Sequence, residues 1–277
     1  MKFTKMQGAG NDYIYINCFA ERVEDPAALA VRVSDRHFGI GADGLVLICP
    51  SEIATFKMRI FNADGSEAKM CGNATRCVAK YVRENGMTAA DTITLETLSG
   101  VKTIAMEMFA GKVLSATVDM GAPILEGAML PALFEGETCI AQPLPGLDYR
   151  VTCISMGNPH CVVFVEDTEA FPLEAVGSLV EKHPWFPDRV NAEFVRVVDG
   201  THIQMRVWER GSGETLACGT GACASVVACV LNGYCQKDSD VTVLLRGGAL
   251  VIRWDSARNT VFMKGPAAFV CTGEIEA

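Results

Sequence analysis

Two cysteines in near-copies of one phrase are the residues best suited to chemistry. Cys71 stands in MCGNATRC and Cys218 in ACGTGACA, and each is followed by glycine at the expected start of a helix. A thiol acts as a base only as the thiolate, and its pKa of about 8.5 falls near a helix N-terminus. We therefore expect two thiols, one in each copy, that face one substrate from opposite sides.

This pair fits proton abstraction from a carbon next to a carboxylate. One thiolate would remove the proton, and the opposite thiol would return a proton to the other face and so invert the centre. Unpaired N–H groups at two helix starts could hold the carboxylate. Glycine at 72, 219 and 221 lets the backbone donors approach closely. Oriented dipoles of this kind stabilise the charge that develops in the transition state.

The two cysteine phrases belong to a duplication with an offset of 147 residues. The run MRIFN at 58–62 matches MRVWE at 205–209, Asn11 falls on Asn158, and Glu67 falls on Glu214. Two copies account for most of the 277 residues, which is enough chain for two ordinary cores. The expected domains are 1–117 plus 265–277, and 118–264.

Short β-type runs separated by turn residues dominate both halves. The expected strands are 13–18, 44–49, 57–61, 92–97, 102–108, 112–119, 161–165, 193–198, 202–207, 241–245, 249–255 and 260–264, and the expected helices are 26–36, 74–84, 173–182 and 222–231.

The helix that follows each cysteine is the informative one. Asn73 and Thr220 are the expected N-caps, and Gly86 and Gly233 suit the left-handed position after each C-terminus. The second helix is apolar on all sides, which predicts burial all round. We expect an α/β fold of the α+β type with two pseudo-symmetric domains, each a mostly antiparallel barrel-like sheet wrapped around a central helix.

Composition excludes several function classes. Hydrophobic residues make up 49% and charged residues 21%, as in ordinary globular proteins. The net charge of −9 and the absence of a basic stripe argue against a nucleic-acid partner. No apolar export segment follows Met1 and no bilayer span is present, so we expect a cytoplasmic protein without a membrane partner. Eight cysteines are expected as reduced core or near-core residues: Cys18, Cys49, Cys77, Cys139, Cys153, Cys161, Cys229 and Cys271.

Other functions for the two cysteines compete with proton transfer that inverts a carbon centre. No CxxC occurs, so no metal site is expected. The glycines of 39–44 have the wrong spacing for a dinucleotide fingerprint. A thiol oxidoreductase that cycles through a Cys71–Cys218 disulfide is the main rival of another class. Within isomerases, a two-thiol racemase for hydroxyproline or glutamate is the second rival. Arg210 discriminates against a monocarboxylate such as hydroxyproline, which would not require it.

The chain resembles diaminopimelate epimerases over nearly its whole length. The resemblance rests on KMQGAGNDYIYI, DRHFGIGADGL, FNADGSEAKMCGNATRC, MGNPHCVVFVED, NAEFV and WERGSGETLACGTGACAS, in that order and spacing. It implies a cofactor-independent enzyme that converts LL- to meso-diaminopimelate on the route to lysine and peptidoglycan. It also implies two similar domains with the site in the cleft between them, and a homodimer.

The resemblance implies a role for individual residues. Cys71 and Cys218 match the two acid–base residues of the family, and His160 and Glu209 match side chains that assist the thiols. The cradle for the α-carboxylate is matched by Gly72, Asn73, Gly219 and Thr220, and the substrate contacts by Asn11, Asn62, Asn158, Asn191, Glu209 and Arg210.

Three positions depart from the pattern of the family. Gln7 stands where many members have His, and Tyr13 where Phe is common. Gly44 replaces a Gln that some members use as a substrate contact, although one branch of the family shares the glycine. The roles of Gln7 and Gly44 are therefore open. Arg210 could form two hydrogen bonds to a distal carboxylate and Glu209 could bind an ammonium group, which suits a substrate with an amino-carboxylate at each end.

Overall fold

The computed structural model describes residues 1–276, which divide into two compact units. Unit 1 comprises Met1–Asp119 and Lys264–Ala277, and unit 2 comprises Met120–Met263. Ala277, the last residue of the expected N-terminal domain, lies outside the described residues. None of the helices within residues 1–276 is both long and apolar enough to span a bilayer.

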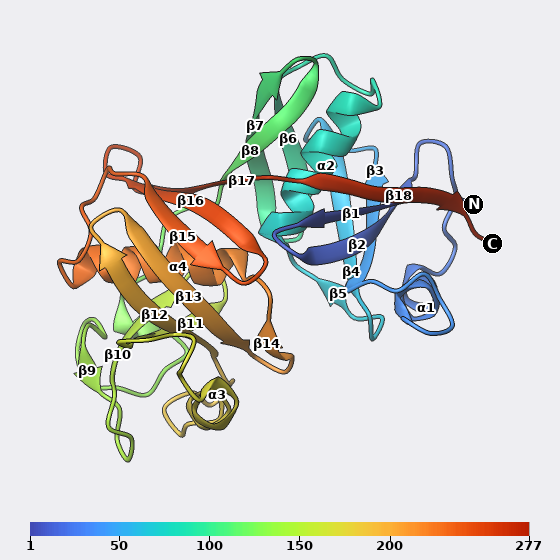
Figure 1. Ribbon diagram of the computed structural model, residues 1–277. Coiled ribbons are helices and arrows are strands. Elements are labelled where there is room, and N and C mark those ends of the chain that lie inside the picture. Colours follow the sequence, from blue (N-terminus) through green and yellow to red (C-terminus); the bar gives the residue numbers. More distant parts are fainter. Residues whose placement is uncertain (277) are drawn as a thin grey trace. The chain divides into compact units, whose positions relative to one another are not determined.

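Strands dominate unit 1, and its two helices each lie between strands along the chain (Figure 1). Its elements are β1 (Lys2–Gly8), β2 (Asn11–Asn17), α1 (Pro26–Ser34), β3 (Gly44–Cys49), β4 (Phe56–Asn62), β5 (Glu67–Ala68), α2 (Gly72–Glu84), β6 (Thr92–Thr97), β7 (Gly100–Phe109), β8 (Lys112–Asp119) and β18 (Ala268–Glu274).

Unit 2 has the same kinds of element. They are η1 (Gly127–Met129), β9 (Gln142–Pro143), β10 (Arg150–Ser155), β11 (Pro159–Phe164), α3 (Leu173–Glu181), β12 (Asn191–Asp199), β13 (His202–Glu209), β14 (Gly213–Thr215), α4 (Gly219–Leu231), β15 (Val241–Leu245), β16 (Gly248–Asp255) and β17 (Thr260–Gly265), whose last residues belong to unit 1.

The strand pairings of the two units repeat each other. In unit 1 the sheet runs β18-β1-β2-β3-β4-β6-β7-β8, with β2–β3 and β4–β6 parallel and the other pairs antiparallel. In unit 2 it runs β9-β10-β11-β12-β13-β15-β16, with β11–β12 and β13–β15 parallel at the corresponding places. The short strands β5 and β14 each pair with the strand before them. The duplication seen in the sequence is therefore a duplication of topology.

A central helix follows each short strand. Helix α2 packs against β1, β2, β7 and β8, and α4 packs against β10, β11, β12, β13, β15 and β16 (Figure 1). Residues 221–229 of α4 are all buried, as its apolar sequence predicted. Gly86 and Gly233 have positive φ values of 70° and 76° after the ends of the helices, which confirms their predicted conformation. The expected fold class is confirmed.

The outer helices α1 and α3 cover separate cores. Asp25 caps α1 by accepting a hydrogen bond from the N–H of Ala28 at 3.0 Å, and Pro26 occupies the first turn. Leu29 and Val33 then pack into the core formed with β2 and β3. In unit 2 the core beneath α3 contains Phe194, which stacks on Phe171 at 4.5 Å between ring centroids.

All twelve cysteines are free thiols. Five of the eight expected in or near the core are buried, and Cys18 and Cys49 are half-buried. The expectation is wrong for Cys271, which is exposed. It lies in β18, where four consecutive residues, 269 to 272, are exposed.

Candidate active site

The first thiol lies at the N-terminus of α2. Cys71 is the N-cap, with extended φ and ψ of −138° and 119°, and its carbonyl accepts from the N–H and hydroxyl of Thr75, both at 2.9 Å. Its Sγ donates to Asn11 Oδ1 at 3.3 Å, while Asn11 Nδ2 donates to Asp43 Oδ2 at 2.7 Å. Because a carboxylate accepts only from the amide nitrogen, Asp43 orients the amide oxygen of Asn11 toward the thiol.

The next residues of α2 are those predicted to form a carboxylate cradle in unit 1. Gly72 and Asn73 are the first two helical residues, so their N–H groups have no acceptor within the helix. Sequence reasoning missed Arg76, a fully buried cation that donates to Asn73 Oδ1 at 2.9 Å, Gly72 O at 3.3 Å and Pro266 O at 3.2 Å. Its charge lies within hydrogen-bond distance of the cradle, where it favours a bound anion.

Asn62, Gln7 and Gly44 have local structural roles in unit 1. Asn62 ends β4, and its amide donates to Ser66 Oγ at 2.9 Å within the β4–β5 turn. Gln7 Oε1 accepts from the N–H of Gly10 at 2.9 Å and fixes the β1–β2 turn. A Cβ at residue 44 would lie 2.1 Å from the carbonyl oxygen of Phe61, so the close pairing of β3 and β4 requires glycine there. A Gln side chain does not fit this backbone.

The second thiol repeats the geometry of the first at the start of α4. Cys218 is the N-cap, with φ and ψ of −118° and 112°, and is 6% exposed. Its Sγ accepts from the N–H of Gly221 at 3.3 Å and lies 3.5 Å from Thr220 Oγ1. The predicted N-caps Asn73 and Thr220 are therefore wrong: each is the second helical residue, and the cysteine itself occupies the cap position because its backbone is extended.

Burial changes the electrostatics expected for Cys218. Desolvation, followed by the charges of Glu209 and Glu193, raises the pKa of this thiol well above its ordinary value. Hydrogen bonds with Thr220 and with the Gly221 N–H lower the pKa of the thiol, but their effect is smaller than that of burial and charge. The expectation of a pKa lowered at the helix N-terminus is therefore wrong for Cys218, because burial of the sulfur raises its pKa.

A chain of polar side chains leads from the core of unit 2 to Cys218. His160 Nδ1 lies 2.7 Å from Glu193 Oε1, and His160 Nε2 lies 3.1 Å from Asn158 Oδ1. Asn158 Nδ2 donates to Thr220 Oγ1 at 3.2 Å. Sequence reasoning predicted His160, Asn158 and Thr220 but missed Glu193, whose only sequence signal is an acidic residue between the apolar residues Ala192 and Phe194.

Gly221 is the point where this chain and the thiol approach each other. A Cβ on residue 221 would lie 2.6 Å from Glu193 Oε1 and 3.2 Å from Cys218 Sγ. The first distance is too short for any side chain, so only glycine lets the helix start, the carboxylate and the sulfur pack together. This confirms the expectation that glycine at this position permits close approach.

The remaining predicted residues of unit 2 gather at the end of β13. Asn191 Oδ1 accepts from the N–H of Arg210 at 2.9 Å, and Asn191 Nδ2 donates to Pro159 O at 3.0 Å. The side chain of Arg210 is held by the Asp188 carbonyl at 3.1 Å. Glu209 Oε1 accepts from the Thr215 hydroxyl at 2.5 Å. Asn191 thus positions the backbone of the turn that presents Glu209 and Arg210.

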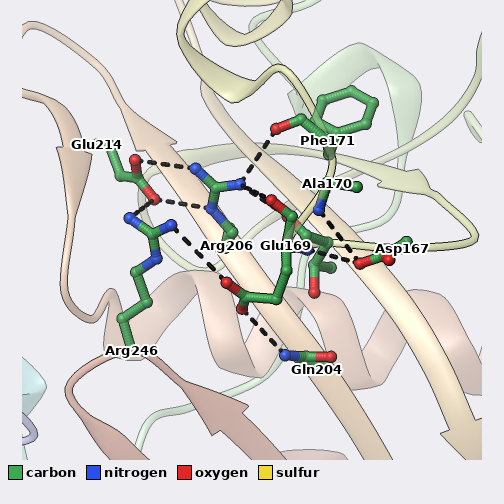
Figure 2. Close-up of polar contacts among 9 residues, drawn as sticks. Asp167, Glu169, Ala170, Phe171, Gln204, Arg206, Glu214 and Arg246 are labelled. Carbon is green, nitrogen blue, oxygen red and sulfur yellow. Dashed lines mark hydrogen bonds and ion pairs between the residues drawn. The ribbon is translucent and has the colours of Figure 1, made fainter.

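An arginine also anchors the hairpin of β13 and β14, which leads into Cys218 (Figure 2). Arg206 donates to both carboxylate oxygens of Glu214, at 2.8 and 3.1 Å, and to the carbonyls of Thr168 at 2.7 Å and Phe171 at 3.1 Å. Arg246 binds the same carboxylate at 2.9 Å. The hairpin is thereby tied to the segment that enters α3.

The structure therefore brings the predicted residues together in three groups, except for Asn62, which bonds within the β4–β5 turn. Unit 1 holds one group around the first thiol, and unit 2 holds one around the second thiol and one at the β13–β14 turn. No group of three or more His, Cys, Asp or Glu side chains suited to a metal ion occurs among residues 1–276. The groups are Asn11, Cys71, Gly72 and Asn73; Asn158, His160, Cys218, Gly219 and Thr220; and Asn191, Glu209 and Arg210.

The chain is similar to known proteins over its full length. The family model described as diaminopimelate epimerase matches residues 3–126 and 152–270. The chain is 56% identical to a diaminopimelate epimerase of Acetivibrio thermocellus, over 100% of this chain and 99% of that protein. It is 52% identical to a diaminopimelate epimerase of Methanococcus maripaludis, over 100% of both chains.

Solved structures share the fold at low sequence identity. A Bacillus anthracis phenazine biosynthesis protein of the PhzF family superposes with a TM-score of 0.75 at 16% identity, over 100% of this chain and 99% of that chain. Such a likeness shows the fold alone.

Proposed function

This chain belongs to the diaminopimelate epimerase family, and we propose that it converts LL-2,6-diaminopimelate to the meso isomer by proton transfer between two thiols. The observation that carries the proposal is the position of Cys71 and Cys218, which are the N-caps of corresponding helices in two copies of one fold. A duplication of this kind supplies the two acid–base groups that inversion of a carbon requires. We propose that the two compact units are the two epimerase domains.

The chemistry needs no cofactor in this proposal. One cysteine, as thiolate, takes the α-proton, so the Cα–H bond breaks and its electron pair moves into the carboxylate-stabilised carbanion. The other cysteine, as thiol, gives its proton to the opposite face. The free N–H groups of Gly72 and Asn73, and of Gly219 and Thr220, hold the α-carboxylate and stabilise the developing charge. His160 and Glu209 assist the thiols in this proposal, as the resemblance implies.

The raised pKa of Cys218 suits this sequence of events. Burial and then the charge of Glu209 favour the neutral thiol. A thiol ready to give a proton is what the second step requires, and in the reverse reaction the same group must become the base. Substrate binding brings an ammonium group and removes water, which changes the balance between thiol and thiolate.

Selectivity for a substrate with two amino-carboxylate ends is assigned to Asn11, Asn62, Asn158, Asn191, Glu209 and Arg210. Arg210 binds the distal carboxylate through its guanidinium group, and Glu209 lies next to it at the end of β13. We further propose a cytoplasmic enzyme of lysine and peptidoglycan precursor synthesis that acts as a homodimer, as the resemblance implies.

Deuterium exchange tests the reaction directly. The enzyme is incubated with LL-diaminopimelate in heavy water, under reducing conditions and without pyridoxal phosphate. We expect the meso product with one deuterium at the inverted carbon, measured by mass spectrometry and chiral chromatography. Cys71→Ala and Cys218→Ala should each lower the rate at least about a thousandfold, whereas Cys49→Ala, a half-buried cysteine of β3, should not. Turnover of dithiols without exchange would instead support the oxidoreductase.

A variant of Arg210 tests whether the substrate has a distal carboxylate, as diaminopimelate does and the monocarboxylate substrates of other two-thiol racemases do not. Arg210→Ala should reduce kcat/KM for diaminopimelate by about a hundredfold or more, because a charge-assisted bidentate contact is lost. Arg253→Ala removes an exposed arginine of the same unit and should leave kcat/KM unchanged. Full activity of the Arg210 variant would contradict the assignment of the distal carboxylate.

A further inference from the structure

Glu193 is a carboxylate that the proposed reaction does not use, and it is fully buried. Its side chain and that of His160 are both 0% exposed. Oε1 contacts His160 Nδ1 at 2.7 Å, and within residues 1–276 Oε2 has no hydrogen-bond partner. An ionised carboxylate without water or a compensating charge is very costly at such a position. The negative charge of Glu193 must therefore either be balanced by a protonated His160 or be removed by a proton on the carboxylate.

The orientation of the Asn158 amide bears on the number of protons on this pair. As the amide is oriented in the structure, its oxygen lies 3.1 Å from His160 Nε2, and an amide oxygen can only accept, so in this arrangement Nε2 carries a proton. The contact between His160 Nδ1 and Glu193 Oε1 needs a second proton, because otherwise a lone pair on the nitrogen would face a lone pair on the oxygen. With only one proton on the pair, one of these two contacts would bring two acceptor atoms together with no hydrogen between them. The pair thus holds two protons and has no net charge, whichever of the two atoms carries the second proton.

With two protons on this pair, each hydrogen bond in the chain of side chains is donated in the direction of Cys218. His160 Nε2–H donates to Asn158, which leaves the amide nitrogen of Asn158 to donate to Thr220 Oγ1. When Cys218 ionises, its thiolate can only accept, so the hydroxyl hydrogen of Thr220 then points to Cys218 Sγ, 3.5 Å away. Together with the N–H of Gly221 at 3.3 Å, this places two donors on the sulfur.

We propose that Glu193 is a positioning residue that keeps His160 protonated on Nε2, and thereby directs the Asn158–Thr220 chain so that it donates a hydrogen bond to Cys218. The inference rests on the proposed role of Cys218. Glu193 lies at the far end of the chain and acts through its intermediate members. If His160 held its proton on Nδ1 alone, Asn158 would reverse, and Thr220 would donate to Asn158 instead of to the sulfur.

The proton count is tested on the unaltered enzyme. The chain has four histidines, so the ¹⁵N spectrum of histidine-labelled protein is simple. His37→Gln, His183→Gln and His202→Gln each remove one set of signals and leave that of His160 by elimination. We expect both ring nitrogens of His160, or Nε2 together with the Glu193 carboxyl, to carry a proton at neutral pH. An Nε2 without a proton would overturn the proposal.

The effect on the thiol is tested with Glu193→Met, which keeps the length of the side chain and removes its charge. If Glu193 directs the donors, alkylation of Cys218 by iodoacetamide at pH 8 should slow about tenfold, because the thiolate loses a hydrogen bond. If Glu193 acts only as a nearby negative charge, its removal should speed the same alkylation. An increase, or no change, would contradict the proposal.

Two further measurements separate this effect from loss of the fold and from failure of the proposed reaction. Alkylation of Cys71, which belongs to unit 1, is the internal control in the same sample and should be unchanged. Both rates are read by mass spectrometry without substrate, so they do not depend on which amino acid is inverted. With diaminopimelate, we expect kcat to fall about tenfold and KM to stay within about twofold.

Discussion

Arg206 donates two parallel hydrogen bonds to Glu214, at 2.8 and 3.1 Å, and Arg59 binds Glu67 in unit 1 with the same atoms at the same distances. The two pairs are separated by the 147-residue offset of the duplication. Each ties the short strand that precedes a cysteine to the strand before it. The same ion pair therefore fixes the approach of the chain to both thiols.

The two arginines differ in burial, which predicts different effects on stability. The Arg206 side chain is 9% exposed and also donates to backbone carbonyls, whereas Arg59 is 38% exposed. Arg206→Met should cost about 2–4 kcal/mol, because buried carbonyls lose their donor. Arg59→Met should cost about 1 kcal/mol or less. Urea unfolding measures both, and equal losses would show that burial does not decide the difference.

Gly221 should tolerate no side chain. Gly221→Ala places a Cβ 2.6 Å from Glu193 Oε1, so the carboxylate or the helix start must move. We expect a loss of about 1–3 kcal/mol in unfolding free energy and a large fall in kcat. In Gly200→Ala, by contrast, the nearest atom lies 3.9 Å from the new Cβ, and both quantities should change little. An active and stable Gly221 variant would contradict the packing described here.

Glu209 should hold back the ionisation of Cys218. Burial and then the charge of Glu209 raise the pKa of the thiol, so its alkylation should still accelerate as the pH rises above 9. Glu209→Gln removes the negative charge and should lower this pKa, which speeds alkylation at pH 8 even though epimerisation falls. The pH dependence of Cys218 labelling, followed by mass spectrometry, measures the shift. An unchanged or alkaline-shifted profile would exclude an electrostatic role for Glu209.

Asp199 should contribute stability that acid removes. The N–H of Thr201, the ring of His202 and the Thr201 hydroxyl lower the pKa of Asp199 to about 2. Its ordinary value in an unfolded chain is about 3.9. Because the folded pKa is the lower one, the stabilisation is complete above about pH 4 and disappears as the pH falls through about 2.

The matched measurement for Asp199 compares the wild type with Asp199→Asn. The difference in unfolding free energy should be largest near pH 5 and should shrink toward pH 2. A difference that stays constant over this range would mean that the carboxylate is not responsible. Direct titration of the Asp199 carboxyl by NMR provides an independent value.

Much of the fold could be predicted because its strands and helices carry local patterns. The strands β3, β6, β8 and β15 begin and end where the sequence predicted. The strands β10 and β18 had no such pattern. Five consecutive residues of β10 are buried and four consecutive residues of β18 are exposed, so neither shows the alternation that marks a half-buried strand.

The site divides in the same way. The thiols, the glycines and the asparagines are marked by the duplication and the resemblance, and their roles remain predictions. Arg76 and Glu193 could not be predicted, because a charged residue is expected at the surface, and its burial depends on partners that only the fold brings near. The pKa of Cys218 was missed for a related reason: a helix start is visible in the sequence, but the depth at which it is buried is not.

The paired arginine forks also separate a repeated part of the molecule from a part that is not repeated. The fork recurs with the same atoms in both halves. Other positions differ between the halves, such as Gly44 against Asn191 and Arg76 against Cys223. The scaffold that precedes each sulfur is thus symmetric, and any chemical difference between the surroundings of the two thiols must come from the positions that do not repeat.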